Sequence, residues 1–433
     1  MRQIKKKEKK GRLFSRRELL KTSLTGAAGL AIGSTLGISV VKAERPIKFG
    51  LHGVCSGPGG LAGESSLFAM KLWAEEVNRK GGLLGRTVEV VQRDTLGKPE
   101  EAVRYTREFA ASGDIDFIIA HGSSAEAFGV AAISKDVKKL ITSQNQVLEY
   151  TADPKVRSRY CFRIAPNALI NFIGSGQYVA RISKELGLTR WFTVAADYSF
   201  GRDTVNFFLE FLKKYSPEAE IVGQVWPKLF EADYSPQITA LLAAKPHAVF
   251  NALWGGDVIS FVKQGSMYGI FEKFKFFFSD LADYYIIDAI VKALGKLPAG
   301  MHAKVKYLKI FPDTKANHGF NDAYIKRFGT YPNYWASFIY AGALLIEAAV
   351  KKAGTTENEA VIRALDDLSA KVPTGVGPGG TVTMRARDHQ LINYADGFGV
   401  TIPEEPFLAN IVPGSWDKII EEETIWLKKK GWL

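Results

Sequence analysis

IKFGLHGVCSGPGGLAGESSLFAMKLWAEEVNRKGG, residues 47–82, encodes a strand, a glycine-rich turn and a helix in succession. Residues 47–54 form an apolar run of strand length. Residues 63–79 carry Phe68, Leu72 and Trp73 at helical spacing, and the two glycines that follow are expected to end the helix. This order predicts the first unit of an α/β fold.

The same alternation continues toward the C-terminus and restarts once. We expect strands at 88–92, 115–120, 140–142, 160–165, 191–195, 221–226, 248–253 and 275–278. We expect helices from 99 and at 125–134, 170–186, 201–214, 236–243 and 258–268. A third section predicts an alternating strand at 305–310, helices at 317–328, 334–352 and 356–369, and a Gly/Pro-rich segment at 373–380 before short strands and a polar tail. Continuous apolar strands between helices predict two doubly wound parallel sheets, one in each of two lobes.

Toward the N-terminus, the chain carries a twin-arginine signature, Ser15-Arg16-Arg17-Glu18-Leu19-Leu20-Lys21. A basic run precedes it, a glycine-diluted apolar stretch follows at 22–41, and Val41-Lys42-Ala43 supplies small residues for cleavage. We therefore predict a twin-arginine signal peptide at 1–43 and export to the periplasm. The alternative is a membrane anchor, and an uncleaved leader would keep the protein at the membrane. No later stretch predicts a membrane span.

The leader also explains most of the positive charge. The chain has a formal net charge of +12, and the first 43 residues hold eleven Lys and Arg against two acidic residues. The remainder is nearly neutral, so composition supplies no basic face and we predict no nucleic-acid partner. Cys55 and Cys161 could pair in an oxidising compartment. They belong to different predicted strands, so we expect two buried free thiols.

Ligands of open α/β sheets bind beyond the carboxyl ends of the strands. The residues that follow the predicted strands there are polar and aromatic, with few charges. The candidate ligand-binding residues are Ser123, Ser124, Gln144, Gln146, Tyr198, Phe200, Trp254 and Asp280. Such a set is typical of a site that holds a small ligand by hydrogen bonds and packs it between rings.

Each candidate also has a structural interpretation. Ser123 and Ser124 precede a helix, where they either cap it or offer hydroxyl and backbone N–H groups to a carboxylate. Trp254 either fills the core or lines the site. Tyr198 and Phe200 can be loop packing. Asp280 is either a helix N-cap or an acceptor for a ligand ammonium or amide. His121 lies near the same cleft, where a ligand role is a further alternative.

One motif favours a different class of protein. Residues 57–62, Gly-Pro-Gly-Gly-Leu-Ala, fit a dinucleotide fingerprint between a strand and a helix. Pro58 removes a backbone donor from that turn, and Asp94 lies beyond the usual spacing of about 20 residues. An exported NAD(P)-dependent oxidoreductase remains the alternative function. The chain has no Gly-x-Ser-x-Gly, His-Glu-x-x-His or Cys-x-x-Cys motif, so we predict no catalytic residue, metal site or cofactor.

Several segments resemble the leucine/isoleucine/valine-binding family of periplasmic (type I) solute-binding proteins of ABC transporters. They are the opening strand with Ser56-Gly57-Pro58, the helix end Glu75-Glu76-Val77-Asn78-Arg79-Lys80-Gly81-Gly82-Leu83-Leu84-Gly85-Arg86, the loop Asp197-Tyr198-Ser199-Phe200-Gly201-Arg202-Asp203, and Thr381-Val382-Thr383-Met384-Arg385 with Asp388-His389-Gln390. The resemblance covers essentially the whole chain after the leader.

The resemblance implies two lobes joined by three crossing strands, which close on a small ligand and deliver it to the permease subunits of an ABC importer. It implies that Ser123 holds a ligand carboxylate and that Asp280 pairs with an ammonium. It also places Gln144 and Gln146, with the aromatic Phe200 and Trp254, at ligand contacts.

Two departures leave the ligand open. Ala62 stands where the family has an aromatic residue, and the loop at 144–146 carries amides where the family has small residues. A leucine-like amino acid, a polar amino acid, an amide and an aromatic acid are therefore all retained.

We predict lobe one at 46–165 and 304–373, and lobe two at 166–303 and 374–433. The predicted protein is a non-enzymatic, exported solute-binding component. A ligand-sensing receptor module is a third alternative, disfavoured because no membrane or signalling segment is fused to the predicted lobes.

Overall fold

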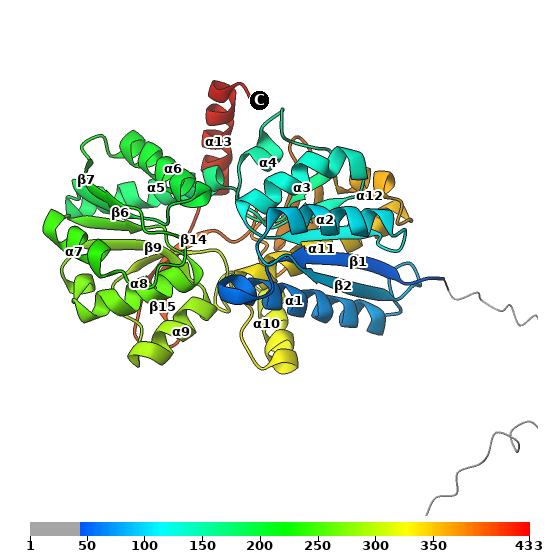
Figure 1. Cartoon of the computed structure of the whole chain (residues 1–433), viewed down its shortest axis with the longest axis horizontal. Coiled ribbons are helices and arrows are strands. Elements are labelled where there is room, and N and C mark those ends of the chain that lie inside the picture. The colour runs from blue at the N-terminus through cyan, green and yellow to red at the C-terminus, as the bar shows by residue number, and fades with distance from the viewer. Residues whose placement is uncertain (1–43) are drawn as a thin grey trace, which may run out of the picture. The chain divides into compact units, whose positions relative to one another are not determined.

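The computed structural model describes residues 44–433, and the predicted signal peptide at 1–43 lies outside the described residues. The described part contains two sheets, each in its own lobe (Figure 1). The first sheet has the order β11 (Leu368–Lys371), β12 (Thr381–Arg385), β13 (Gln390–Ile392), β5 (Cys161–Arg163), β4 (Ile141–Ser143), β3 (Phe117–His121), β1 (Ile47–Gly53) and β2 (Val88–Asp94). The second has the order β15 (Leu408–Pro413), β14 (Gly397–Thr401), β10 (His302–Val305), β9 (Phe276–Ala282), β8 (Ala248–Asn251), β6 (Arg190–Val194) and β7 (Glu220–Val225).

Most neighbouring strands are parallel, which confirms the predicted fold class. Strands β1 to β5 pair in parallel in the first sheet, as do β6 to β10 in the second. Antiparallel strands extend one edge of each sheet, where β12 pairs with β11 and β13, and β14 pairs with β10 and β15. Both sheets are therefore mixed and dominated by parallel pairs.

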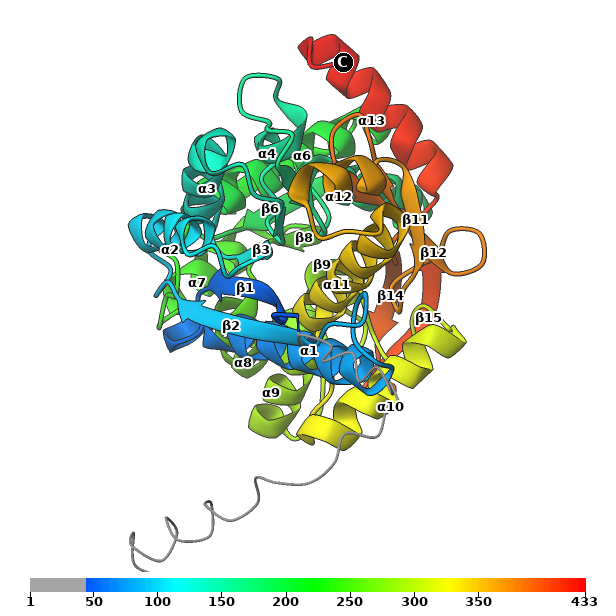
Figure 2. The ribbon, with the colours of Figure 1, turned by 90° about the vertical axis from the view of Figure 1, so that its right-hand side faces the viewer.

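Helices cover both faces of the first sheet, and the strand sequence explains why. Along β3, Phe117 and Ile119 join one hydrophobic cluster while Ile118 joins another, since alternate residues face opposite sides. Figure 2 shows α1 and α11 on one side of this sheet and α2 and α3 on the other. The helices of this lobe are α1 (Gly60–Arg79), α2 (Pro99–Ala111), α3 (Ser124–Val137), α4 (Glu149–Ala152), α10 (Lys315–Phe328), α11 (Tyr334–Ala353) and α12 (Asn358–Leu365), with the short 3-10 helix η1 (Gly57–Gly59).

The second sheet follows the same rule. Val249 of β8 packs in one cluster, and its neighbours Ala248 and Phe250 pack in another. The helices here are α5 (Ala168–Leu186), α6 (Ser199–Tyr215), α7 (Ser235–Ala244), α8 (Gly255–Met267) and α9 (Tyr284–Leu294), with η2 (Ile270–Glu272).

Three segments lead from one sheet to the other, at 164–167, 306–314 and 393–396. Strands β12 and β13 belong to the first sheet although they lie within 374–433, the range predicted for lobe two. The predicted lobe boundaries stay a prediction. The strands of the first sheet come from residues 47–163 and 368–392, and those of the second sheet come from residues 190–305 and 397–413.

Three local predictions were wrong. Polar and apolar side chains alternate over residues 305–310, but these residues do not form a strand. Strand β10 ends at Val305, and the alternation reflects how the crossing segment packs. Helix α9 was missed, since its apolar residues continue directly from β9. The predicted polar tail contains the helix α13 (Trp416–Lys430), whose buried face at Ile419, Glu423 and Leu427 includes a charged residue.

Helix α13 stands at the boundary between the two lobes (Figure 1). On the first-lobe side, Glu423 accepts hydrogen bonds of 2.6 and 2.9 Å from Arg385 of β12. On the second-lobe side, Trp426 Nε1 donates to Glu210 of α6 at 3.0 Å, and Glu422 pairs with Lys214. The helix thus contacts both lobes through polar side chains.

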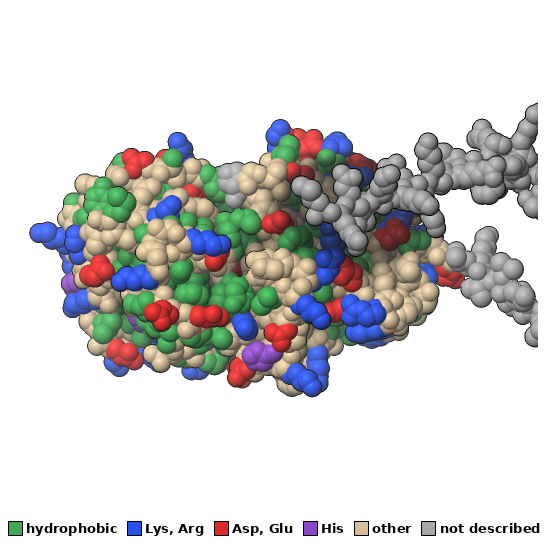
Figure 3. Space-filling view, turned by 90° about the horizontal axis from the view of Figure 1, so that it is seen from below, with side chains coloured by type: hydrophobic (Ala, Val, Ile, Leu, Met, Phe, Trp, Pro, Cys, Tyr) green, Lys and Arg blue, Asp and Glu red, His purple; other side chains and the backbone are tan. Residues whose placement is uncertain are grey.

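The described surface carries charges of both signs. On the face seen in Figure 3, basic and acidic side chains are interspersed and do not gather in one basic area. Among the helices of residues 44–433, none combines the length and apolarity needed to cross a bilayer. Both cysteines are free: Cys161 is buried as expected, whereas Cys55 is only partly buried.

Candidate ligand-binding site

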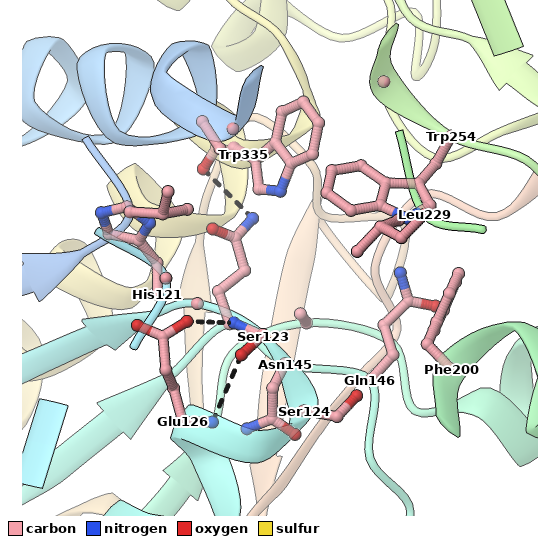
Figure 4. Close-up of a pocket in the computed structure, with 18 of the residues that line it drawn as sticks. His121, Ser123, Ser124, Glu126, Asn145, Gln146, Phe200, Leu229, Trp254 and Trp335 are labelled. Atoms are coloured by element: carbon pink, nitrogen blue, oxygen red, sulfur yellow. Dashed lines mark hydrogen bonds between the residues drawn. The ribbon is translucent and has the colours of Figure 1, made fainter. Parts of the chain in front are cut away.

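A cavity of about 520 Å³ lies between the two lobes, at the carboxyl ends of strands from both sheets. All eight sequence-predicted residues line it. Figure 4 shows Glu126, Ser123 and Asn145 of the first lobe facing Trp254, Leu229 and Phe200 of the second. The volume is typical of a small-molecule site. The binding role of each residue remains a prediction, whereas their assembly around one cavity is an observation.

The N-terminus of α3 forms the first wall. Ser123 Oγ accepts from the Glu126 backbone N–H at 3.3 Å, and the Ser123 N–H donates to Glu126 Oε2 at 2.7 Å. This is a complete capping box, so Ser123 is a helix cap, as its structural interpretation held. Glu126 was missed as a lining residue. The Ser-x-x-Glu spacing was the signal that could have found it.

Two buried histidines lie next to this wall. Burial lowers the pKa of His121, which lines the cavity, to about 4. Burial likewise lowers the pKa of His52 to about 3, and its Nε2 lies 2.9 Å from the Thr106 hydroxyl. Both rings are neutral at physiological pH, so neither supplies a positive charge to a ligand.

The loop after β4 contributes amide groups. Gln144 Nε2 donates to the backbone oxygen of Trp335 at 3.3 Å, while Gln144 Oε1 is buried and has no hydrogen-bond partner among the described residues. Gln146 Oε1 accepts from Asn171 Nδ2 at 3.5 Å. Asn145 is held within its own loop by Ser143 Oγ and by the Val147 N–H. Gln144 Oε1 is therefore an acceptor without a donor.

Aromatic side chains build the second-lobe wall. Trp254, half-buried at the N-terminus of α8, donates from Nε1 to Tyr198 Oη at 2.6 Å. Its ring lies edge-on to the rings of Phe230 and Trp335, with distances between ring centres of 6.0 and 6.2 Å. Burial raises the pKa of Tyr198 well above its usual range, so the hydroxyl keeps its proton. The Phe200 ring lies beside the Tyr198 ring, with 5.9 Å between the ring centres.

Asp280 faces the cavity from within β9 rather than from the loop expected after the strand. Its carboxylate forms an ion pair with Lys306, whose ammonium also lies 5.1 Å from the centre of the Tyr334 ring. Three residues further, Asp283 caps α9 and accepts the Tyr334 N–H at 2.9 Å across the lobe boundary. Burial raises the pKa of Asp283 to about 6.

Several lining residues escaped the sequence prediction because they do not follow a strand directly. Tyr334 and Trp335 begin α11, and Leu229 and Phe230 belong to a loop between β7 and α7. Other missed apolar contributors are Val54, Leu96, Ala165, Pro166 and Ile286. A search restricted to strand ends could not reach helix starts and long loops.

The glycine turn has a structural role in this fold. Asp94 Oδ1 accepts the N–H groups of Cys55 and Leu96, both at 2.9 Å, and so fixes the loop that leads into η1. Residues 44–433 contain no group of three or more His, Cys, Asp or Glu side chains placed to hold a metal ion.

Comparison with known proteins shows which family shares this architecture. The model of the family described as periplasmic binding protein matches residues 46–400. A Brucella abortus protein named Leu/Ile/Val-binding protein homolog 4 is 27% identical, over 86% of this chain and 88% of its own length.

Two solved structures share the fold. The solute-binding protein of an ABC transporter from Rhodopseudomonas palustris, in complex with 3,4-dihydroxybenzoic acid, has a TM-score of 0.74 at 21% identity, covering 86% of this chain and 98% of its own. The amino acid ABC transporter substrate-binding protein from Pseudomonas fluorescens has a TM-score of 0.74 at 22% identity, covering 86% and 96%.

Proposed function

This chain belongs to the periplasmic binding protein family, and on that premise we propose that it captures a small organic solute and delivers it to an ABC importer. The family match favours this function over the oxidoreductase alternative, and we propose that the protein has no enzymatic activity of its own. The proposed ligand is an amino acid or a related amide or carboxylate.

The observation that carries the proposal is the shared lining of the cavity. Ser123, Ser124, Gln144 and Gln146 come from one lobe, and Tyr198, Phe200, Trp254 and Asp280 come from the other. A ligand that contacts both groups stabilises the closed arrangement more than any open one. Binding therefore shifts the population toward closure.

Binding proceeds in two stages in this proposal. The solute first contacts the polar groups of the first lobe, at the N-terminus of α3 and the loop after β4. Closure then brings the aromatic wall of Tyr198 and Trp254 over it and excludes water. The closed form is the one that the permease subunits recognise.

We further propose that the protein works in the periplasm and reaches it through the twin-arginine leader at 1–43. The Arg16-Arg17 pair and the small residues before Glu44 support this route. Replacing both arginines by lysine, with the location followed in cell fractions, tests the route independently of ligand binding.

Ligand capture is tested with the solute that accompanies the purified protein. The solute is extracted after denaturation, identified by mass spectrometry and returned to refolded protein. We expect a higher melting temperature and a smaller radius of gyration in X-ray scattering, because a ligand bound only to the closed state stabilises it. A solute that binds without any change in scattering would contradict capture by closure.

A further inference from the structure

The cavity has one place suited to a ligand anion, and a carboxylate of the protein already occupies part of it. The N-terminal N–H groups of a helix attract carboxylates, and α3 points its N-terminus at the cavity. There the Glu126 carboxylate accepts the Ser123 N–H at 2.7 Å and the Thr95 hydroxyl at 2.5 Å. Glu126 is only 3% exposed, so a ligand carboxylate beside it would meet a poorly screened like charge.

The cavity also has one place suited to a ligand cation, and this is occupied as well. Asp280 lines the cavity, and its carboxylate is paired with the Lys306 ammonium. The Lys306 side chain is only 4% exposed. If a ligand ammonium took its place beside Asp280, the Lys306 ammonium would not have water close by to solvate it. An incoming cation would have to leave this lysine unpaired inside the protein.

No compensating positive charge lines the cavity. The described lining residues include neither lysine nor arginine, and the buried His121 is neutral because its pKa lies near 4. A carboxylate drawn from water into this space would lose its hydration without gaining an ionic partner.

One buried atom of the described lining does lack a partner, and it is an acceptor. Gln144 is 7% exposed, and its Oε1 is buried without a hydrogen bond from the described residues. The bond from Nε2 to the Trp335 carbonyl fixes the orientation of the amide, because a rotated amide would set two oxygens against each other. A buried acceptor held in this way is unsatisfied, and Gln144 lines the cavity from which a ligand donor would reach it.

From these contacts we infer that the ligand is uncharged and presents an N–H or O–H donor to Gln144, as a primary amide does, with its apolar body against Trp254. This inference rests on the proposed function and narrows its ligand class. Glu126 and the Asp280–Lys306 pair act as specificity determinants that disfavour carboxylates, ammonium ions and zwitterions.

Matched probes test the inference. Ligand-free protein is titrated calorimetrically at pH 7.5 with benzamide and benzoate, phenylacetamide and phenylacetate, and isovaleramide and isovalerate. We expect at least one amide to bind about tenfold or more tightly than its carboxylate. Glu126→Gln, which keeps the shape and removes the charge, should reduce this preference about tenfold, whereas the control Glu89→Gln, at an exposed position of the edge strand β2 and outside the cavity lining, should not.

The wild-type series alone decides the inference if Glu126→Gln fails to fold. Tighter binding of the carboxylates, equal binding within every pair, or no binding by any amide overturns it. An unchanged preference in a folded Glu126→Gln variant removes Glu126 as its cause. The proposed function is judged separately, by the extracted solute and the scattering measurement, so it can stand when the neutral-ligand inference falls.

Discussion

The indole Nε1 of Trp254 donates a hydrogen bond of 2.6 Å to the hydroxyl oxygen of Tyr198. The bond fixes the indole that precedes α8 against a residue that precedes α6, so the two loops form one wall of the cavity. Because the Tyr198 oxygen accepts this bond, its own proton remains to be donated to a ligand acceptor.

Substitution of this wall should weaken binding without unfolding the protein. With the amide probe that binds most tightly, we expect Trp254→Ala to reduce affinity about 30-fold or more, because it removes one of the two indole rings that line the site. Tyr198→Phe should reduce it about fivefold, since one hydrogen bond is lost and the ring stays. Trp432→Ala, near the C-terminus and outside the cavity lining, serves as the control in calorimetry. Equal affinities for Trp254→Ala and Trp432→Ala would remove Trp254 from the site.

Lys306→Met should convert the cavity into one that accepts a cation. The substitution leaves the Asp280 carboxylate without its partner, and Asp280 remains 23% exposed, so the expected loss of folding free energy is about 1–3 kcal/mol. Benzylamine should bind this variant about tenfold more tightly than wild type. The double variant with Asp280→Asn should lose that gain. A gain that persists in the double variant would show that Asp280 is not the cation partner.

Asp283 should make stability fall as pH rises. Burial raises its pKa to about 6, above the usual value of 3.8. Well below pH 3.8 the group is protonated in both states and costs nothing. Between pH 4 and 6 it ionises first in the unfolded chain, so it removes about 3 kcal/mol of folding free energy by pH 7.

Urea unfolding at pH 4 and pH 7 measures this contribution as a difference between variants. Asp283→Asn should lower the free energy of unfolding at both pH values, because one backbone N–H loses its acceptor. It should also remove the decrease in that free energy between pH 4 and pH 7 that the ionisation of Asp283 causes. Asp288→Asn, an exposed position on the same helix, should leave the wild-type pH dependence intact. The same pH dependence in Asp283→Asn and wild type would contradict the assignment.

Neighbouring glutamates of α13 should differ sharply in their effect on stability. Glu423 is 1% exposed and accepts two bonds from Arg385, so Glu423→Gln should cost about 3 kcal/mol in urea unfolding. Glu422 pairs with Lys214 nearer the surface, and Glu422→Gln should cost less than about 1 kcal/mol. Similar losses for both variants would show that the buried network does not hold the helix.

The sequence predicted the sheets and the cavity edge well because both depend on local patterns. Strand β3 reads as an apolar run because it is buried on both faces, and the residues that follow it must lie at the carboxyl edge of the sheet. These two rules brought Ser123 and Trp254 together in one prediction, although they belong to different lobes.

What the sequence could not provide is the pairing of distant charges. Asp280 looked available to a ligand until the structure placed Lys306 beside it, across an intervening helix. Trp335 and Gln144 are brought into contact by helix packing rather than by any spacing along the chain. Helix α13 was hidden for a related reason, since Glu423 interrupts an apolar face and is accommodated by Arg385 and Arg387, which lie far from it along the chain.

The placement of α13 limits how the molecule can open. Its side chains hold Arg385 in one lobe and Glu210 in the other, so an opening that keeps both contacts must pivot alongside this helix. Motion is then smallest at the pivot and largest at the opposite mouth of the cavity. Paired spectroscopic labels on the two sides of this helix, at positions that leave Glu423 and Glu210 intact, would stay at constant separation and serve as an internal ruler, while labels across the mouth would report every opening event.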